Sequence, residues 1–262
     1  MKAKPELVSS YKELPSGKKI YFASDFHLGV PDKKTSRERE MKIVKWLEHV
    51  STDAQAIFLV GDLFDFWFEY KSTIPKGFLR FQGKLAALRD RGIAIHFFTG
   101  NHDLWMFGYF EEELGIIIHK NPIVLEINEA RLFVGHGDGL GPGESTFKFI
   151  KRVFKHPFAI WLFQWVHPTI GVALAKFWSK RSRIGTESKD DHFLNEDEIL
   201  YQFCKEAETH HHHDFYIFGH RHLPLEMDVS ARAKYFNLGD WINHCTYLTF
   251  DGKHASLDTF DA

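Results

Sequence analysis

Cysteine is scarce in this sequence, and the segments that would indicate a secreted chain are also missing. The 262 residues contain only Cys204 and Cys245, and neither belongs to a paired motif. This usage favours a reducing compartment over a disulfide-stabilised domain. Residues 1–19 are polar and lack the apolar core of a signal peptide. We therefore expect a cytoplasmic protein.

The sequence also lacks an excess of either charge. Its net charge of −2 gives no reason to expect nucleic acid as a partner. Hydrophobic residues make up 44% and charged residues 26%, which is close to globular averages and excludes gross disorder. The chain has no internal repeat of solenoid length, and it is long enough to bury a substantial core. We predict a single domain over residues 1–262.

Apolar runs alternate with amphipathic patterns through the first half of the chain. Residues 20–23, 56–60 and 93–98 are expected to be buried strands, and residues 36–50 and 76–91 helices. Residues 122–127 and 131–134 have the pattern of a hairpin, and residues 214–218 that of another strand. The last four predicted strands, at 225–229, 233–238, 246–250 and 255–260, are expected to form a β-meander. The predicted fold class is α/β, a two-sheet α/β/β/α sandwich with helices outside.

Five short polar motifs recur along the chain, and most of them directly follow an apolar run. Parallel strands present their carboxyl ends at one edge of a sheet, so these motifs are expected to meet in space. Each combines Asp, Asn or His with a small residue. They are Asp25-Phe26-His27, Gly61-Asp62-Leu63-Phe64-Asp65, Gly100-Asn101-His102-Asp103, Gly135-His136-Gly137-Asp138 and Gly219-His220-Arg221-His222.

These residue types suit a site for two divalent ions. Hydrolysis of a phosphate ester or anhydride is assisted by two ions about 3.5–4 Å apart, which activate a water and neutralise the phosphoryl oxygens. Carboxylates, amides and imidazoles are the ligands that such ions take. Since residues two apart on a strand end point the same way, paired ligands are expected in two of the motifs. We assign Asp25, His27, Asp62 and His222 to one ion, and Asp62 as a bridge, Asn101, His136 and His220 to the other.

Neighbouring residues of the same motifs are candidates for catalysis without binding an ion. His102 can stabilise the phosphate or protonate the leaving group, and Asp65 is its expected orienting partner. Asp103 and Asp138 are candidates for carboxylates that hold the metal-binding histidines in place. Any one of these motifs alone would favour turn residues and core histidines over a site. Their number and order favour the site.

Residues 145–192 differ from the rest of the chain. Residues 145–189 hold nine Lys or Arg against one acid, together with nine aromatic residues, and Pro157 and Pro168 divide them into short helices. The stretch 157–178 has the length of a membrane span, but Gln164 and Lys176 interrupt it. A basic, aromatic-rich element of this kind is typical of a helix at a lipid surface. The alternative is an ordinary helical hairpin packed on the core.

The motifs resemble those of the calcineurin-like metallophosphoesterase superfamily over essentially the whole chain. Within it, the sequence is most similar to the UDP-2,3-diacylglucosamine pyrophosphatases of lipid A synthesis. The narrower resemblance is carried by Asp62 to Trp67, by His136-Gly137-Asp138 with Leu140 and Glu144, by Phe154 to Arg183, and by Gly239-Asp240-Trp241. One departure is His102, where the best-known members have Arg and the superfamily in general has His.

This resemblance implies a fold, an activity and a set of contacts. It implies a helical lid at 145–192 that receives the acyl chains and contacts the inner membrane. It also implies hydrolysis of a UDP-linked diacylated sugar lipid to UMP and 2,3-diacylglucosamine 1-phosphate, with two divalent cations, preferably Mn²⁺. The implied substrate contacts are Glu144, Ser182, Arg183 and Lys189. The alternatives are a metallophosphoesterase acting on nucleotides, nucleic acid or phosphoproteins, and a scaffold without metals.

Overall fold

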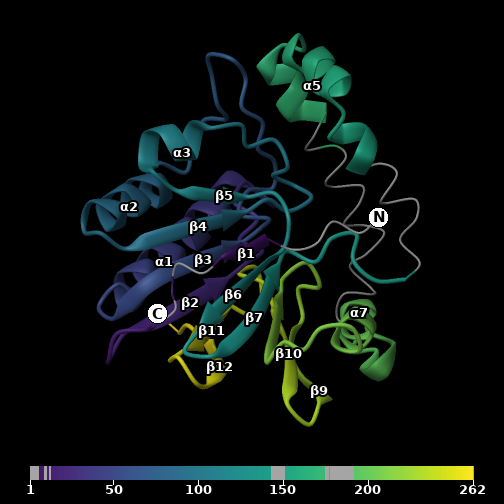
Figure 1. Cartoon of the computed structure of the whole chain (residues 1–262). Helices are drawn as coiled ribbons and strands as arrows, with labels where there is room; N and C mark the ends of the chain where they lie inside the picture. Colours follow the sequence, from purple (N-terminus) through teal and green to yellow (C-terminus); the bar gives the residue numbers. More distant parts are fainter. Residues whose placement is uncertain are drawn as a thin grey trace.

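Two six-stranded sheets form the centre of the molecule. The computed structural model describes residues 6–8, 11, 13–142, 151–174, 177 and 192–261. One sheet has the strand order β12-β11-β2-β3-β4-β5, and the other has the order β1-β6-β7-β8-β10-β9. Helices lie on the outer side of each sheet, with α1, α2 and α3 beside the first and α7 beside the second (Figure 1). The predicted α/β/β/α sandwich is confirmed.

The first sheet carries three of the five motifs. Its strands are β2 (Lys19–Ala23), β3 (Ala54–Val60), β4 (Ala94–Phe98), β5 (Ile117–His119), β11 (Thr246–Phe250) and β12 (Ala255–Thr259). β2, β3, β4 and β5 pair in parallel, whereas β11 pairs antiparallel with both β2 and β12. The parallel strands therefore deliver the motifs that follow β2, β3 and β4 to one edge of the sheet.

The second sheet carries the other two motifs. Its strands are β1 (Glu6–Val8), β6 (Ile123–Ile127), β7 (Ala130–Gly135), β8 (Phe215–Phe218), β9 (Pro224–Ser230) and β10 (Ala233–Leu238). β7 and β8 pair in parallel, with Gly135 opposite Phe218. The residues that follow these two strands, His136 and His220, therefore lie side by side.

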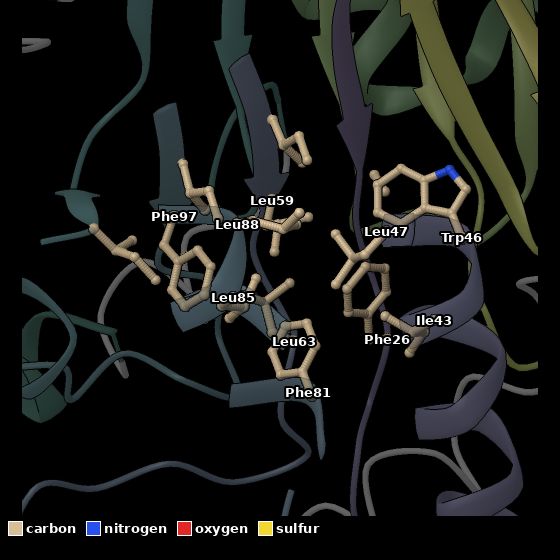
Figure 2. Close-up of a cluster of buried hydrophobic side chains, with 14 of the residues drawn as sticks. Phe26, Ile43, Trp46, Leu47, Leu59, Leu63, Phe81, Leu85, Leu88 and Phe97 are labelled. Carbon is tan, nitrogen blue, oxygen red and sulfur yellow. The ribbon is translucent and has the colours of Figure 1, made fainter. Parts of the chain in front are cut away.

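The helices cover the first sheet through one apolar cluster. They are α1 (Lys33–Val50), α2 (Leu79–Asp90) and α3 (Tyr109–Leu114). Asp32 caps α1, because its carboxylate accepts hydrogen bonds from the backbone amides of Lys34 and Thr35. Figure 2 shows Ile43 and Trp46 of α1, with Phe81 of α2, pointing into this cluster. A second apolar cluster fills the space between the sheets, and a third lies beneath α7 (Ile199–Glu208).

The predicted terminal β-meander is wrong. β9 and β10 form an antiparallel pair in the second sheet, whereas β11 and β12 belong to the first. The chain crosses between the sheets in residues 239–245, where Asp240 accepts hydrogen bonds from the backbone amides of Asn243 and His244. Alternating apolar residues predict a strand but do not tell to which sheet it belongs. The sequence pattern therefore did not indicate that the chain crosses between the sheets.

A further helix, α5 (Pro157–Gln164), stands apart from both sheets (Figure 1). It begins at a proline in its first turn, as the sequence indicated, and has no buried residue. No helix in the described part of the chain has the length and apolar character needed to cross a membrane.

Candidate metal centre

All five motifs meet where the two sheets face each other. Asp25, Asp62 and Asn101 follow β2, β3 and β4, and His136 and His220 follow β7 and β8. The backbone joins the first two loops directly, because the amide of Asp25 donates to the carbonyl of Gly61 and the amide of His27 donates to the carbonyl of Asp62. The predicted convergence is therefore present, and it draws on both sheets.

One group of possible ligands consists of Asp25, His27 and His222. Oδ1 of Asp25 lies 3.2 Å from Nε2 of His222 and 3.7 Å from Nε2 of His27. The two imidazole Nε2 atoms are 3.1 Å apart. Three side chains thus direct electron-rich atoms at a common point, which is the arrangement that a cation stabilises.

A second group consists of Asp62, His136 and His220, whose ligand atoms all lie within 4.8 Å of one another. Oδ2 of Asp62 is 3.3 Å from Nε2 of His136 and 4.0 Å from Nε2 of His27, so this carboxylate faces both groups. Oδ1 of Asn101 is 3.4 Å from Nε2 of His136. Nδ1 of His136 lies 2.9 Å from the carbonyl of Val60, so the other ring nitrogen, Nε2, faces the group.

Five of the seven predicted ligands have a left-handed backbone. The φ angles are 56° at Asp25, 42° at His27, 52° at Asp62, 68° at His220 and 60° at His222. Residues with a Cβ rarely adopt this conformation, which costs about 1–2 kcal/mol each. Strand alternation, which we expected to align the paired ligands, is therefore not the cause of their convergence. The tight turns after β2 and β8 direct the side chains inward.

The two carboxylates are buried and remain ionised. Burial alone would raise the pKa of Asp25, but His222 and His27 outweigh it and lower that pKa. In the same way, His136 and His102 bring the pKa of Asp62 well below its usual value. Burial lowers the pKa of His220 to about 4. His136 has its pKa raised to about 10, because the attraction of Asp62 exceeds the effect of burial.

His102 lies outside the first group but forms a third one with His27 and Asp65, in which the possible ligand atoms all lie within 4.8 Å of one another. Its Nδ1 is 3.0 Å from the backbone carbonyl of Asp65 and 3.7 Å from the Asp65 carboxylate. The nearer partner is thus the carbonyl, whereas the sequence suggested the side chain. Nδ1 donates to this carbonyl, so the lone pair of the neutral ring is on Nε2. The backbone amide of His102 also donates to Oδ1 of Asp62.

Asp103 joins two of the motif loops from behind. Its carboxylate accepts hydrogen bonds from the backbone amides of Leu63, at 2.8 Å, and Gly100, at 2.7 Å. Burial, reinforced by Asp62, raises the pKa of Asp103 to about 7. Asp138, the other predicted supporting carboxylate, instead forms an ion pair with Lys151.

Sequence reasoning missed three other residues that hold the loops. Arg39 of α1 donates to the carbonyls of Phe26 and His27. Asn237 of β10 donates to the carbonyl of Gly219 at 2.6 Å. Neither residue has a motif or a spacing that links it to the site, so only the fold identifies them.

The third is Glu198, a buried carboxylate before α7. It binds the guanidinium of Arg221, with Nε at 2.9 Å from Oε2 and Nη2 at 3.2 Å from Oε1. Arg221 separates His220 from His222 in the last motif. This bidentate pair therefore fixes the loop that carries two predicted ligands.

Three motif glycines lie against predicted ligands. A Cβ on Gly100 would lie 2.1 Å from Oδ1 of Asp62, and one on Gly219 would lie 2.4 Å from Oδ2 of Asp25. A Cβ on Gly61 would lie 2.5 Å from Nδ1 of His136. The expected close approach of backbone to the site is present at these positions.

The predicted substrate contacts, three in the lid and one just before it, lie outside the described residues. They are Glu144, Ser182, Arg183 and Lys189. Of the predicted lid, 145–192, the described part is 151–174, 177 and 192. Here Phe163 is inserted among aromatic side chains that follow the motifs, at 4.7 Å from Phe68 and 5.8 Å from Trp105 between ring centroids. Three other large side chains of α5, those of Phe158, Trp161 and Leu162, are exposed.

The model of the calcineurin-like phosphoesterase family matches residues 18–224 of this chain. A Porphyromonas gingivalis protein named UDP-2,3-diacylglucosamine hydrolase is 38% identical over 256 residues, covering 93% of this chain and 98% of that protein. An Aeromonas salmonicida protein of the same name is 27% identical, covering 90% of this chain and 91% of that protein. Among solved structures, Yfce, a phosphoesterase from E. coli, is 17% identical, with a TM-score of 0.46 and 92% of each chain covered. The family match includes all five motifs.

Proposed function

The chain belongs to the calcineurin-like phosphoesterase family, and we propose that it hydrolyses the diphosphate of UDP-2,3-diacylglucosamine in a metal-dependent reaction. The products are UMP and 2,3-diacylglucosamine 1-phosphate. The name of the 38% identical relative supports this substrate. The observation that carries the proposal is the meeting of six predicted ligands from two sheets in two adjoining groups, with the seventh, Asn101, 3.4 Å from Nε2 of His136.

The donor set fits a pair of divalent cations. Among the described residues, Oδ1 of Asp25 is buried and has no hydrogen bond of acceptable geometry, although Nε2 of His222 lies nearby. A buried carboxylate oxygen in this state is stabilised by a cation. Asp25, His27, Asp62 and His222 would hold one ion, and Asp62, Asn101, His136 and His220 the other. Bound ions supply positive charge to the phosphoryl oxygens and lower the pKa of a bound water. The O and N ligands suit Mn²⁺.

His102 is the proposed acid or phosphate-stabilising group of the reaction. Its Nδ1 is held by the carbonyl of Asp65, and its ring contacts that of His27 edge to face, at 4.9 Å between centroids. Protonated on Nε2, it can donate to a phosphoryl oxygen or to the oxygen of the departing product. The carboxylate of Asp65 lies 3.7 Å from Nδ1 of His102 and 3.9 Å from Nδ1 of His27.

We further propose that residues 145–192 form a lid that brings the enzyme to a membrane surface. Exposed aromatic and aliphatic side chains gather on α5 and on the residues that follow it, with Trp165 exposed by 76% and Ile170 by 55%. Aromatic residues next to basic ones favour the interface of an anionic lipid layer. The lid residues Ser182, Arg183 and Lys189, with Glu144 at its start, remain proposed contacts of the substrate.

The direct test is incubation of the purified protein with Mn²⁺ and UDP-2,3-diacylglucosamine, followed by detection of UMP. We expect turnover that a chelator stops and Mn²⁺ restores. A double substitution on α5, Phe158→Ser with Trp161→Ser, should reduce binding to anionic vesicles and leave hydrolysis of bis(p-nitrophenyl) phosphate intact. Cleavage of simple nucleotide phosphodiesters without cleavage of the lipid would instead indicate a nucleotide phosphodiesterase.

A further inference from the structure

A cavity of about 700 Å³ adjoins the candidate metal centre on the side of the second sheet. His136, Gly137 and Asp138 line it on the side of the metal centre, and Phe133 of β7 and Phe203 of α7 also line it. Its size is typical of a pocket for a small organic ligand. A molecule bound at the metal centre can therefore extend one of its ends into this cavity.

The cavity wall carries polar side chains, and a hydrocarbon chain could not pair with those of their atoms that have no partner within the protein. Thr99, Asn121, His119 and His213 line it, and the last two are buried, with 9% and 4% exposed. Covering a polar group without a hydrogen bond costs about 1–3 kcal/mol. A nucleoside has carbonyl, imide and hydroxyl groups that can pair with such side chains, whereas the hydrocarbon tail of an acyl group has none.

A chain of hydrogen bonds behind the wall fixes the orientation of His119. Its Nε2 lies 2.9 Å from Nδ1 of His96, and Nε2 of His96 lies 2.7 Å from the hydroxyl of Tyr11. Burial lowers the pKa of His96 to about 3 and that of His119 to about 4, so both rings are neutral. When the hydroxyl of Tyr11 donates to Nε2 of His96, the hydrogen of the neutral His96 ring is on Nδ1, which donates to Nε2 of His119. The hydrogen of the His119 ring is then on Nδ1, where it can be donated to an acceptor on a ligand. A uracil carbonyl is an acceptor of this kind.

Basic residues surround the opening of the cavity. Lys120, Lys151, Arg152 and Lys155 all line it. Lys151 pairs with Asp138 next to His136, which places a positive charge beside the metal centre. Cationic side chains in this position suit the phosphate of a nucleotide.

The other flank of the metal centre has the opposite character. Phe66, which follows Asp65, and Trp105 both pack against Phe163 of α5. This flank is aromatic and leads to the exposed apolar side chains of α5. A substrate with one lipid end and one nucleoside end matches the two flanks in only one orientation without burying unpaired polar groups.

We propose that this cavity binds the uridine half of the substrate, with the base between its apolar walls and the 5′-phosphate at the basic opening beside His136. The assignment rests on the proposed function, because it takes UDP-2,3-diacylglucosamine as the substrate. It leaves the diacyl half to the aromatic flank.

The test uses the binding of UMP to the full-length, Mn²⁺-loaded protein, measured by calorimetry. Wild-type protein should bind UMP at least tenfold more tightly than ribose 5-phosphate, which lacks the base. Ala207→Trp, which fills the cavity from α7, and Asn121→Ala should each weaken UMP binding at least tenfold. The matched control is Ser72→Trp, which fills a second hollow beside α5 and should leave UMP affinity within twofold. Circular dichroism checks that each variant is folded.

Two results would overturn the assignment. One is unchanged UMP affinity in folded Ala207→Trp. The other is a selective loss of affinity for 2,3-diacylglucosamine 1-phosphate in that variant, which would place an acyl chain in the cavity. Failure of the proposed function is distinct. If the protein binds UMP through these residues but does not cleave UDP-2,3-diacylglucosamine, the cavity is still a nucleotide site and only the proposed lipid substrate is wrong.

Discussion

Gly100 lies so close to Asp62 that a single added methyl group tests the role of this carboxylate. In Gly100→Ala, the new Cβ would lie 2.1 Å from Oδ1 and 2.6 Å from the backbone nitrogen of Asp62. Rotation of the Asp62 side chain relieves the first contact but not the second. The loop after β3 must therefore move away from the loop after β4.

The expected loss has two parts. Overpacking of a tight contact costs about 1–3 kcal/mol of unfolding free energy. Displacing Asp62 also separates its Oδ2 from Nε2 of His136, which is 3.3 Å away. Because Asp62 is the proposed bridge between the ions, we expect apparent Mn²⁺ affinity to fall about 10- to 100-fold. The value of kcat/KM at fixed Mn²⁺ should fall by a similar factor.

The assay combines calorimetric Mn²⁺ titration with urea unfolding of the same samples. Gly83→Ala is the matched control, because Gly83 lies in α2 and a Cβ there meets nothing within 4 Å. This control should keep wild-type Mn²⁺ affinity and gain about 0.5–1 kcal/mol of stability. Wild-type Mn²⁺ affinity in a destabilised Gly100→Ala would refute the assignment of Asp62 as a shared ligand.

Three further predictions concern other parts of the site and core. Asn101→Ala should remove turnover and keep the fold by circular dichroism, and more than about a tenth of the wild-type rate would contradict its assignment as a ligand. Glu198→Ala leaves the guanidinium of Arg221 without its bidentate partner, so Mn²⁺ affinity should fall. Glu198→Gln keeps the shape of the side chain, so its Mn²⁺ affinity should fall less. Equal Mn²⁺ affinities of the two variants in calorimetry would contradict a positioning role. Burial lowers the pKa of His96 to about 3 and that of His119 to about 4, so unfolding takes up protons and the free energy of unfolding falls as the pH drops below about 6.5. His96→Phe should reduce the slope of unfolding free energy against pH by roughly 1.4 kcal/mol per pH unit between pH 6 and 4. An unchanged slope would show that His96 is already charged in the folded protein.

The fold could largely be predicted from the sequence because its central strands are fully buried. β3 (Ala54–Val60) and β4 (Ala94–Phe98) are apolar except for Gln55 and His96, as expected of parallel strands covered on both faces. The short strand β5 (Ile117–His119) and the helix α3 (Tyr109–Leu114) were missed, because three or six residues are too few to show a period. Sheet membership of the last four strands was missed for a different reason, since it depends on one turn at Asp240.

The candidate ligands could be predicted and their supports could not. Asp and His at the ends of apolar runs are visible in one sequence, since each motif is local. Glu198 is 23 residues from Arg221, and Asp103 is 40 residues from Leu63. Contacts at such separations exist only after folding, so a single sequence contains no local signal for them.

The strained backbone of the site has a structural explanation in these distant contacts. His27 and His220 are both left-handed, and each is held by a hydrogen bond from outside its own turn. The carbonyl of His27 accepts from Arg39, and the amide of His220 donates to Oδ2 of Asp25. Asp25 thus joins the two sheets as well as facing the candidate ion position.

Asp25 both faces the candidate ion position and holds the fold, and in this it differs from Asn101. The backbone of Asp25 also accepts from the amide of Trp241, which belongs to the crossing between the sheets. Asp25→Ala should therefore lower both unfolding free energy and Mn²⁺ affinity, because it leaves the amide of His220 without its acceptor. Asn101 reaches the other sheet only through the longer contact of 3.4 Å between its Oδ1 and Nε2 of His136, so its substitution should affect Mn²⁺ binding more than unfolding free energy. Equal stability of the two variants in the metal-free protein would mean that the ions, and not Asp25, hold the left-handed turns in place.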